Sequence, residues 1–271
     1  MTALFSKPVE IHGRALFLSD IHLRTPEDKV SQHREELLLQ LLSQEKERLK
    51  HLFLLGDIFD FWFEYRDVAP KGYFRLFNMF YELYKKGVKI YFFTGNHDMW
   101  VKDYFTTQFG CQIFRSQQAF IINGKRCLVG HGDGLGGKQR KYLLMKSILG
   151  YNPNQKLYSL LHPRHAFSFA RYWSHKSRIA HPDDDKIFKN EEEPQIQYAR
   201  QVLSQESVDY FIYAHRHIPI QYALSEQSTY LNTGEWLNTF SYIVLDDGNE
   251  GPQLLYFTQS QTDESATEKT F

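Results

Sequence analysis

Short runs of apolar residues recur along the chain, and each ends at a small or polar residue. Residues 52–55 form one such run, which stops at Gly56 and Asp57. Continuous apolar runs of this length predict strands that are buried on both faces. In open α/β sheets, ligands bind at the carboxyl ends of the strands. We therefore expect the polar groups that follow these runs, at positions 20–22, 57, 96–98, 131–133 and 215–217, to meet at one edge.

Between these runs, the apolar residues recur with helical spacing. Residues 31–50, 73–86 and 100–109 are predicted helices, and the last two end at Gly87 and Gly110. Successive strand ends are spaced far enough apart for one strand–helix–strand unit, which takes roughly 30 or more residues. This alternation indicates an α/β (α+β) fold with a mostly parallel sheet.

Strands predominate in the second half of the chain. Residues 119–122 and 126–129 flank Asn123-Gly124, a pair typical of a hairpin turn. Residues 191–203 are a predicted helix. The later predicted strands are 210–213, 218–224, 229–231, 242–245 and 254–257. We expect one domain over residues 1–271 that ends in a loose polar tail at 258–271.

The composition is 42% hydrophobic and 16% aromatic over 271 residues, which is sufficient for a large core. Neither a secretory signal nor a run of roughly 18 apolar residues is present, so we expect a cytoplasmic protein. Cys111 and Cys127 lie in apolar, strand-like surroundings. We interpret them as small buried residues rather than as a disulfide or a pair of metal ligands.

The net charge is zero, but residues 134–182 contain no Asp or Glu. Apolar residues alternate with Lys and Arg in this window, so we predict that residues 134–190 form a basic helical lid. Such a lid would bind an anionic amphiphile, because phosphates favour Arg and Lys whereas acyl chains favour an apolar stripe. The alternative is an ordinary helical excursion with a solvated basic face. The candidate substrate-binding residues are Lys138, Arg140, Lys141, Arg171, Lys176 and Arg178.

The polar residues at the strand ends provide oxygen and imidazole donors and no sulfur. This set suits Mn, Fe or Zn better than thiolate-selective metals or calcium. Seven donors exceed the needs of one ion, so we predict two ions that share Asp57. Two ions about 3.5–4 Å apart clamp the attacking and leaving oxygens of a phosphoryl displacement. The candidate ligands are Asp20, His22, Asp57, Asn96, His131, His215 and His217.

These motifs resemble the signature of the calcineurin-like metallophosphoesterases. They stand here as Asp20-Ile-His22, Gly56-Asp-Ile-Phe-Asp60, Gly95-Asn-His-Asp98, Gly130-His131 and Ala214-His-Arg-His217. The resemblance implies a four-layer αββα sandwich with a helical lid insertion. It also implies a hydrolase in which two divalent ions share Asp57, with Asp20, His22 and His217 around one ion and Asn96, His131 and His215 around the other.

Further roles follow from the same resemblance. His97 would stabilise the phosphoryl oxygens or protonate the leaving group, and Asp98 would orient its ring. Asp60 would either bind a metal directly or take a neighbouring role, capping a helix or supporting the ligands. Ala214 departs from the signature, because the family usually has glycine at this position.

The run from Gly56 to Trp62 and the lid resemble one branch of the family, the UDP-2,3-diacylglucosamine pyrophosphatases of lipid A synthesis. That resemblance implies a nucleotide-diphosphate lipid substrate, cleavage to UMP and the lipid 1-phosphate, usually with Mn, and peripheral contact with the cytoplasmic face of the inner membrane. The branch often has arginine where His97 stands here.

Several alternatives therefore stay open. They are a phosphodiesterase acting on nucleic acid or a cyclic nucleotide, a hydrolase of another nucleotide pyrophosphate, and a non-catalytic scaffold. The presence of a suitable ligand type at every signature position argues against the scaffold. The sequence carries no signal for an oligomeric state.

Overall fold

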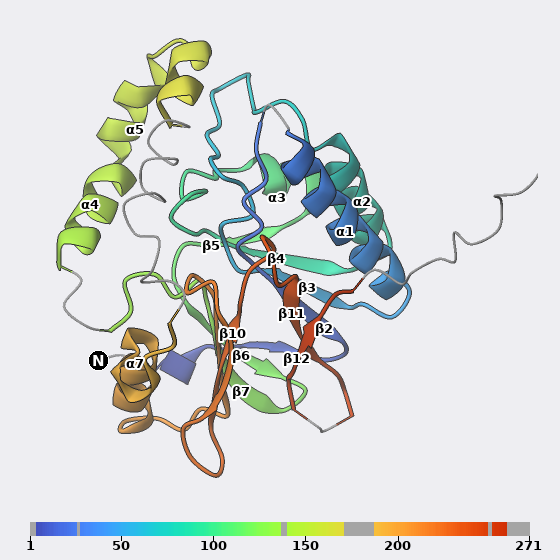
Figure 1. Cartoon of the computed structure of the whole chain (residues 1–271), viewed down its shortest axis with the longest axis vertical. Coiled ribbons are helices and arrows are strands. Elements are labelled where there is room, and N and C mark those ends of the chain that lie inside the picture. The colour runs from blue at the N-terminus through green and yellow to red at the C-terminus, as the bar shows by residue number, and fades with distance from the viewer. Residues whose placement is uncertain (1–3, 26–27, 137–139, 171–186, 249–250, 259–271) are drawn as a thin grey trace, which may run out of the picture.

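The computed structural model describes residues 4–25, 28–136, 140–170, 187–248 and 251–258, and two six-stranded sheets form its centre (Figure 1). The first sheet has the order β12-β11-β2-β3-β4-β5. Its strands are β2 (Ala15–Leu18), β3 (His51–Leu54), β4 (Lys89–Phe93), β5 (Gln112–Phe114), β11 (Ser241–Leu245) and β12 (Gln253–Tyr256). The second sheet has the order β1-β6-β7-β8-β10-β9. Its strands are β1 (Val9–Ile11), β6 (Gln118–Ile122), β7 (Lys125–Val129), β8 (Tyr210–Tyr213), β9 (Pro219–Ala223) and β10 (Thr229–Thr233).

Successive residues of the buried strands enter two different apolar cores. On β3, Phe53 packs between the sheets, whereas Leu52 and Leu54 pack toward the helices. This alternation follows from the two-residue period of a strand. Because both faces are covered, β3 needs an apolar residue at almost every position, which is why its sequence reads as a continuous apolar run.

Helices cover the outer face of each sheet. The first sheet packs against α1 (Lys29–Glu45), α2 (Phe74–Lys85) and α3 (Tyr104–Phe109). The second sheet packs against α7 (Pro194–Leu203), which lies on the opposite side of the sandwich (Figure 1). The order of layers is therefore helix, sheet, sheet, helix, which confirms the predicted four-layer αββα fold.

The parallel strands place the polar residues that follow them at a common edge. β2, β3 and β4 are parallel neighbours in the first sheet, and β7 and β8 are parallel neighbours in the second. Each of these five strands is followed, after one or two intervening residues, by one of the polar groups singled out in the sequence. The prediction of mostly parallel pairing is confirmed, and β11 and β12 extend the first sheet with antiparallel pairs.

Element boundaries differ from the predictions where a polar side chain fixes a helix end. α1 begins at Lys29 because the Asp28 carboxylate accepts a hydrogen bond from the Ser31 amide at 2.7 Å. α3 begins only at Tyr104, because the Glu64 carboxylate accepts hydrogen bonds from the preceding amides. α7 begins at Pro194, after the short 3-10 helix η2 (Asn190–Glu192). The strands β1 and β5 and the 3-10 helix η1 (Leu4–Ser6) were not predicted.

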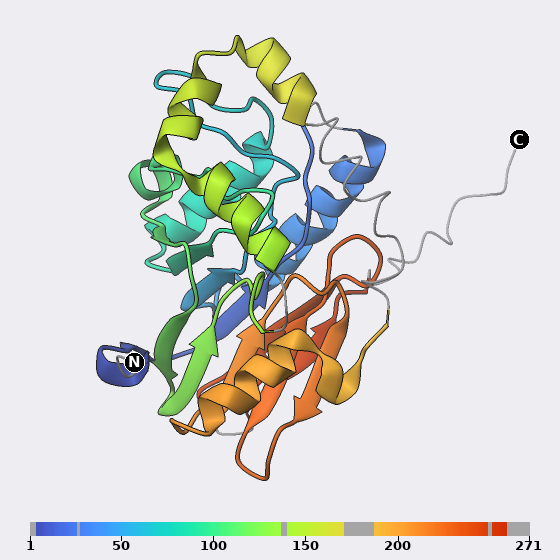
Figure 2. The ribbon, with the colours of Figure 1, turned by 90° about the vertical axis from the view of Figure 1, so that its left-hand side faces the viewer.

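Most of the described residues of the insertion are helical. It contains α4 (Arg140–Gly150), α5 (Asn152–Ser159) and a further helical stretch at residues 163–170. These helices stand on one side of the molecule (Figure 2). No helix among the described residues is long and apolar enough to cross a membrane. The single domain stays a prediction, and of the predicted tail at 258–271, residues 259–271 lie outside the described part.

Candidate metal centre

The seven predicted ligands converge at one edge of the sandwich, at the carboxyl ends of the parallel strands of both sheets. Sequence positions about two hundred residues apart thus become neighbours, because β2 and β8 end at the same side of the sandwich. The first sheet contributes four of them: Asp20, His22, Asp57 and Asn96. The second sheet contributes the other three: His131, His215 and His217.

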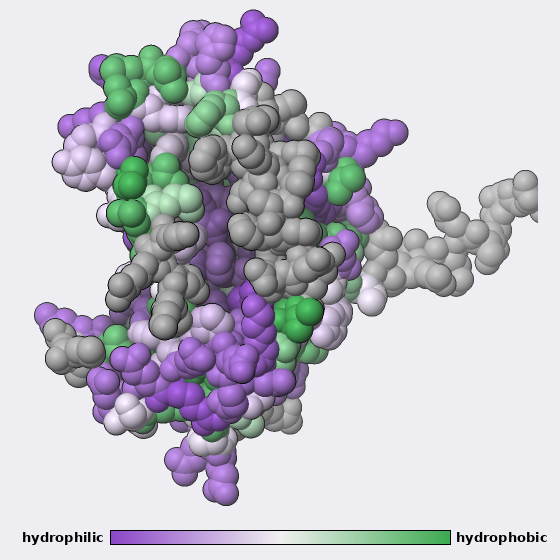
Figure 3. All heavy atoms as spheres, turned by 60° about the vertical axis from the view of Figure 1, so that its left-hand side comes forward, coloured by the Kyte–Doolittle hydropathy of each residue, from purple (hydrophilic) through white to green (hydrophobic). Residues whose placement is uncertain are grey.

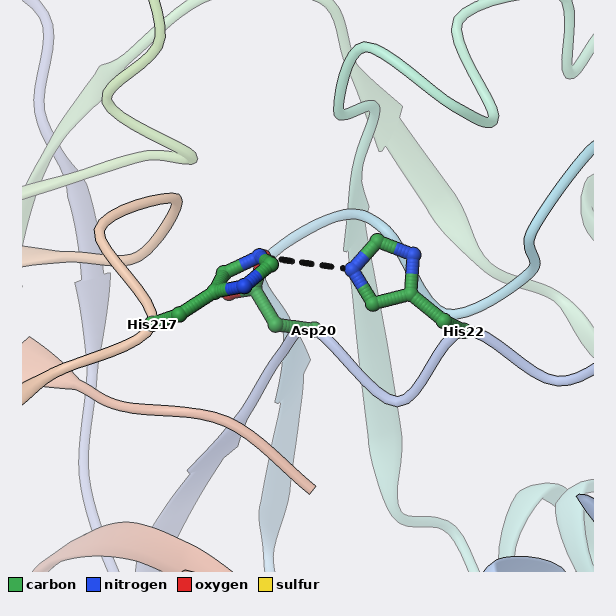
Figure 4. Close-up of side chains that lie close together, drawn as sticks. All are labelled: Asp20, His22 and His217. Carbon is green, nitrogen blue, oxygen red and sulfur yellow. Dashed lines mark hydrogen bonds and ion pairs between the residues drawn. The ribbon is translucent and has the colours of Figure 1, made fainter. Parts of the chain in front are cut away.

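One group of donors consists of Asp20, His22 and His217. Their ligand atoms all lie within 4.8 Å of one another. His217 Nε2 is 3.0 Å from Asp20 Oδ1 and 3.3 Å from His22 Nε2. Figure 4 shows the two rings facing each other over Asp20, one from the loop after β2 and the other from the loop after β8. Two imidazole nitrogens and one carboxylate oxygen that point at a common space form a suitable cradle for a divalent cation.

The second group consists of Asp57, His131 and His215, whose ligand atoms also lie within 4.8 Å of one another. His131 Nε2 is 3.6 Å from Asp57 Oδ2 and 3.3 Å from Asn96 Oδ1. Asn96 therefore joins this group through its amide oxygen. The His131 Nδ1–H donates to the Leu55 carbonyl at 2.7 Å, which fixes the tautomer and turns the Nε2 lone pair toward Asp57.

The protonation states of Asp20 and His215 suit metal binding. Burial alone would raise the pKa of Asp20, but the charge of His217 and its hydrogen bond lower it to about 2. Burial and the neighbouring His131 lower the pKa of His215 to about 4. At neutral pH, Asp20 is thus an anion and His215 is a neutral ring, which are the forms that coordinate cations. The donor set fits divalent ions.

Two glycines make room for these side chains. A Cβ atom on Gly95 would lie 2.2 Å from Asp57 Oδ1, and a Cβ atom on Gly56 would lie 2.7 Å from His131 Nδ1. Gly56 also has a φ of +89°, which disfavours any other residue. The two strand-end glycines therefore let the backbone pass directly against the donors.

Backbone strain is concentrated at the candidate ligands. Among the described residues, most of the non-glycine positions with positive φ, five of nine, are candidate ligands. These are Asp20 (50°), His22 (50°), Asp57 (54°), His215 (73°) and His217 (53°). The left-handed conformation costs of order 1–3 kcal/mol per residue and persists only where the surrounding structure enforces it. The orientation of these side chains therefore comes at a cost in the free energy of unfolding.

His97 interacts with Asp60 rather than with Asp98. The His97 Nδ1–H donates to the Asp60 carbonyl oxygen at 3.0 Å, and the same nitrogen is 3.7 Å from Asp60 Oδ1. The Asp98 carboxylate instead accepts hydrogen bonds from the amides of Gly95 at 2.7 Å and Ile58 at 2.9 Å. The predicted orientation of His97 by Asp98 is therefore corrected, because both Asp98 oxygens are directed at the backbone.

Asp98 fixes the two loops that follow β3 and β4. It is fully buried, and its burial together with the nearby Asp57 charge raises its pKa to about 7. Its two hydrogen bonds join Gly95 of one loop to Ile58 of the other. Asp60 also lies 3.9 Å from His22 Nδ1, so it contacts two rings of the centre. Asp60, His22 and His97 form a third group whose ligand atoms lie within 4.8 Å of one another. The direct and the neighbouring role of Asp60 therefore both stay predictions.

Asp133 was not predicted as part of the centre. Its buried carboxylate accepts hydrogen bonds from the Tyr142 hydroxyl and the Lys146 ammonium group, both on α4. Burial alone would raise the pKa of Asp133, but the charges of His131 and Lys146 hold it well below its usual range. The only sequence signal was its place two residues after His131, and its partners lie in a helix whose orientation the sequence does not give.

None of the candidate substrate-binding side chains belongs to the described part of the structure. Lys138, Arg171, Lys176 and Arg178 lie outside the described residues. Arg140 and Lys141 form the first turn of α4, and their side chains also lie outside the described part. A cation that the sequence reasoning missed is Arg24, which lines a small pocket together with Thr25, Asp60, Phe61 and Phe167. This pocket connects the neighbourhood of the metal centre with the insertion.

The arrangement matches a known class of protein. A four-layer αββα sandwich with two adjoining cation cradles at its open edge is the architecture of a dinuclear phosphoesterase. Residues 13–219 match the family described as calcineurin-like phosphoesterase. The chain therefore belongs to the calcineurin-like phosphoesterase family and is a metal-dependent hydrolase.

Several relatives share nearly the whole chain. A protein of Porphyromonas gingivalis named UDP-2,3-diacylglucosamine hydrolase is 31% identical over 249 residues, which cover 87% of this chain and 95% of the relative. A Vibrio cholerae protein of the same name is 27% identical over 84% of this chain and 93% of the relative. Among solved structures, a phosphoesterase from E. coli, Yfce, is similar over 90% of this chain and its full length, with 15% identity and a TM-score of 0.41.

Proposed function

We propose that the chain hydrolyses UDP-2,3-diacylglucosamine to UMP and the lipid 1-phosphate in lipid A synthesis, with two Mn ions. The observation that carries the proposal is the pair of donor groups, Asp20–His22–His217 and Asp57–His131–His215, at one edge of the sandwich. The names and coverage of the two relatives support the choice of substrate. The oxygen and imidazole donors suit Mn, Fe or Zn, and manganese is chosen because the family branch that the chain resembles usually uses it.

The protein's own residues prepare the site for this reaction. When bound, two ions would activate water and neutralise the charge on a phosphoryl group. Asp57 belongs to the second group of donors, and its Oδ1 accepts the His97 amide at 2.8 Å, so the candidate shared carboxylate is held rigidly. Asp60 fixes the orientation of the His97 ring. His97 is in position to donate a hydrogen bond to a phosphoryl oxygen or a proton to the leaving group.

The insertion offers an apolar surface for the acyl chains. Hydrophobic side chains gather on its side of the molecule, beside a hydrophilic hollow (Figure 3). The large apolar residues most exposed on α4, on α5 and directly after α5 include Leu144 (63%), Ile148 (53%), Leu157 (67%) and Leu160 (80%). Leaving such side chains in water is unfavourable, by about 25 cal/mol per Å² of apolar surface. Their exposure favours an amphiphilic ligand.

The same surface supports peripheral contact with a membrane. The insertion combines exposed apolar residues with a sequence window that has lysines and arginines but no acidic residues. Such a surface would lie in the headgroup region of an anionic bilayer, near a substrate that itself resides there. We place the protein in the cytoplasm, in contact with the cytoplasmic face of the inner membrane.

A substrate panel tests the proposed function. The Mn-loaded protein should release UMP from UDP-2,3-diacylglucosamine faster than it hydrolyses UDP-sugars, cyclic nucleotides or single-stranded DNA, measured by chromatography of the nucleotide products. At saturating Mn, removal of residues 140–170 should slow the lipid reaction much more than the hydrolysis of a small soluble diester. Cleavage of DNA without any action on the lipid would contradict the proposal.

A further inference from the structure

The insertion is joined to a loop that carries a candidate ligand. Asp133 follows His131 by two residues, and its Oδ2 lies 2.5 Å from the Lys146 Nζ atom of α4. The Tyr142 hydroxyl donates to the same oxygen. The Asp133 side chain is only 5% exposed, so solvent screens this ion pair poorly. α4 is thereby attached next to His131.

Further contacts extend this attachment to His215. The rings of Tyr142 and His215 have centroids 6.2 Å apart. The Gln195 side-chain amide, at the start of α7, donates to the carbonyls of Gly132 and Ala214 at 3.0 Å each. Gln195 is buried and links the loop after β7 to the loop after β8. The two loops that carry His131 and His215 are therefore fixed to each other as well as to α4.

The far part of the insertion contacts the first sheet's side of the centre. The Trp100 indole N–H donates to the Leu149 carbonyl at 2.9 Å. The Tyr158 ring packs against Trp100 and Phe63, with ring centroids 4.8 Å apart in both cases. Trp100 and Phe63 follow the loops that carry Asn96 and Asp57. The insertion thus spans the opening from one set of donors to the other.

We propose that Asp133 is a positioning residue that couples the insertion to the metal centre through Tyr142 and Lys146. An ion that fixes His131 would restrict the following loop and hence α4, so metal occupancy would order the insertion before substrate arrives. By thermodynamic reciprocity, a ligand that holds α4 in place raises the affinity for the ion. This coupling rests on the proposed two-ion function and adds a role for the insertion beyond covering the substrate.

Hydrogen exchange with and without Mn tests the coupling. In the unaltered protein, saturating Mn should slow amide exchange in α4 by about 10-fold, within the range by which partners of metal ligands alter affinity. The Tyr142→Phe/Lys146→Met double variant should lose this Mn-dependent protection. Lys146→Arg, which keeps a cationic donor, should retain it. Helix α2, which lies away from the insertion, serves as the internal reference for global stability.

A matched control variant removes one tyrosine hydroxyl and one lysine ammonium group elsewhere on the insertion. Tyr151 and Lys156 are both exposed, so the Tyr151→Phe/Lys156→Met double variant should behave like the unaltered protein. Metal content measured on the same samples distinguishes a failure of the coupling from a failure of the two-ion function. Bound Mn without protection of α4, or equal protection in the Tyr142→Phe/Lys146→Met variant, would overturn the coupling alone. Absence of bound Mn from the unaltered protein would overturn the two-ion function and the coupling with it.

Discussion

Replacing Asp57 by alanine is expected to reduce Mn-dependent phosphodiester hydrolysis by about 10³-fold or more. Asp57 Oδ2 lies 3.6 Å from His131 Nε2, and Asp57 Oδ1 is held by the His97 amide. The variant therefore loses the carboxylate proposed to be shared by the two ions. The measurement is kcat/KM for a chromogenic diester, together with the Mn content of the variant.

The matched control for this variant is Asp67→Ala. The Asp67 side chain is 84% exposed, and its ion pair with Arg66 has a separation of 3.7 Å. Its removal should leave hydrolysis within about twofold of the unaltered protein, as is usual for surface substitutions. Circular dichroism of both variants checks that the fold persists. Full activity in Asp57→Ala would remove the proposed metal chemistry.

Gly95→Ala is expected to be the next most damaging change. Its Cβ atom would lie 2.2 Å from Asp57 Oδ1 and 2.7 Å from the Asp57 amide nitrogen, so the Asp57 loop must move. A displacement of about 1 Å at a reacting centre costs roughly 10²-fold in rate. Overpacking of this kind also lowers the free energy of unfolding by about 1–3 kcal/mol. Kinetics on a small diester and urea denaturation measure the two effects.

Gly150→Ala provides the comparison at a site without crowding. A Cβ atom at Gly150 would meet no atom within 4 Å among the described residues. Because alanine favours helices more than glycine does, this variant should be as stable as the unaltered protein or slightly more stable. Similar losses in Gly95→Ala and Gly150→Ala would show that close packing against Asp57 is unimportant.

The sequence indicated the strands and the convergence of the candidate ligands because one physical requirement produces both signals. β3 is buried on both faces, so its residues are continuously apolar, and Gly56 marks the point where the backbone turns toward Asp57. The same construction recurs at each ligand-bearing strand. The helix-covered four-layer fold follows from that pattern together with the resemblance to a known family.

The contacts beside the ligands were less accessible to prediction. Whether Asp60 or Asp98 reaches His97 depends on the path of two loops, and the resemblance to the family implied the other partner. Asp133 finds Lys146 through the orientation of α4, which no local pattern specifies. Positive φ at Asp20 or His215 is likewise invisible in sequence, because neither residue type requires it. These features come from tertiary structure.

The most direct test is a crystal structure of the protein grown with Mn, using the anomalous signal of the metal. Two peaks about 3.5–4 Å apart are predicted, with Asp57 between them. One peak should contact Asp20, His22 and His217, and the other should contact Asn96, His131 and His215. A single peak, or Mn bound away from these residues at saturating concentration, would contradict the two-ion centre on which the proposed hydrolysis depends.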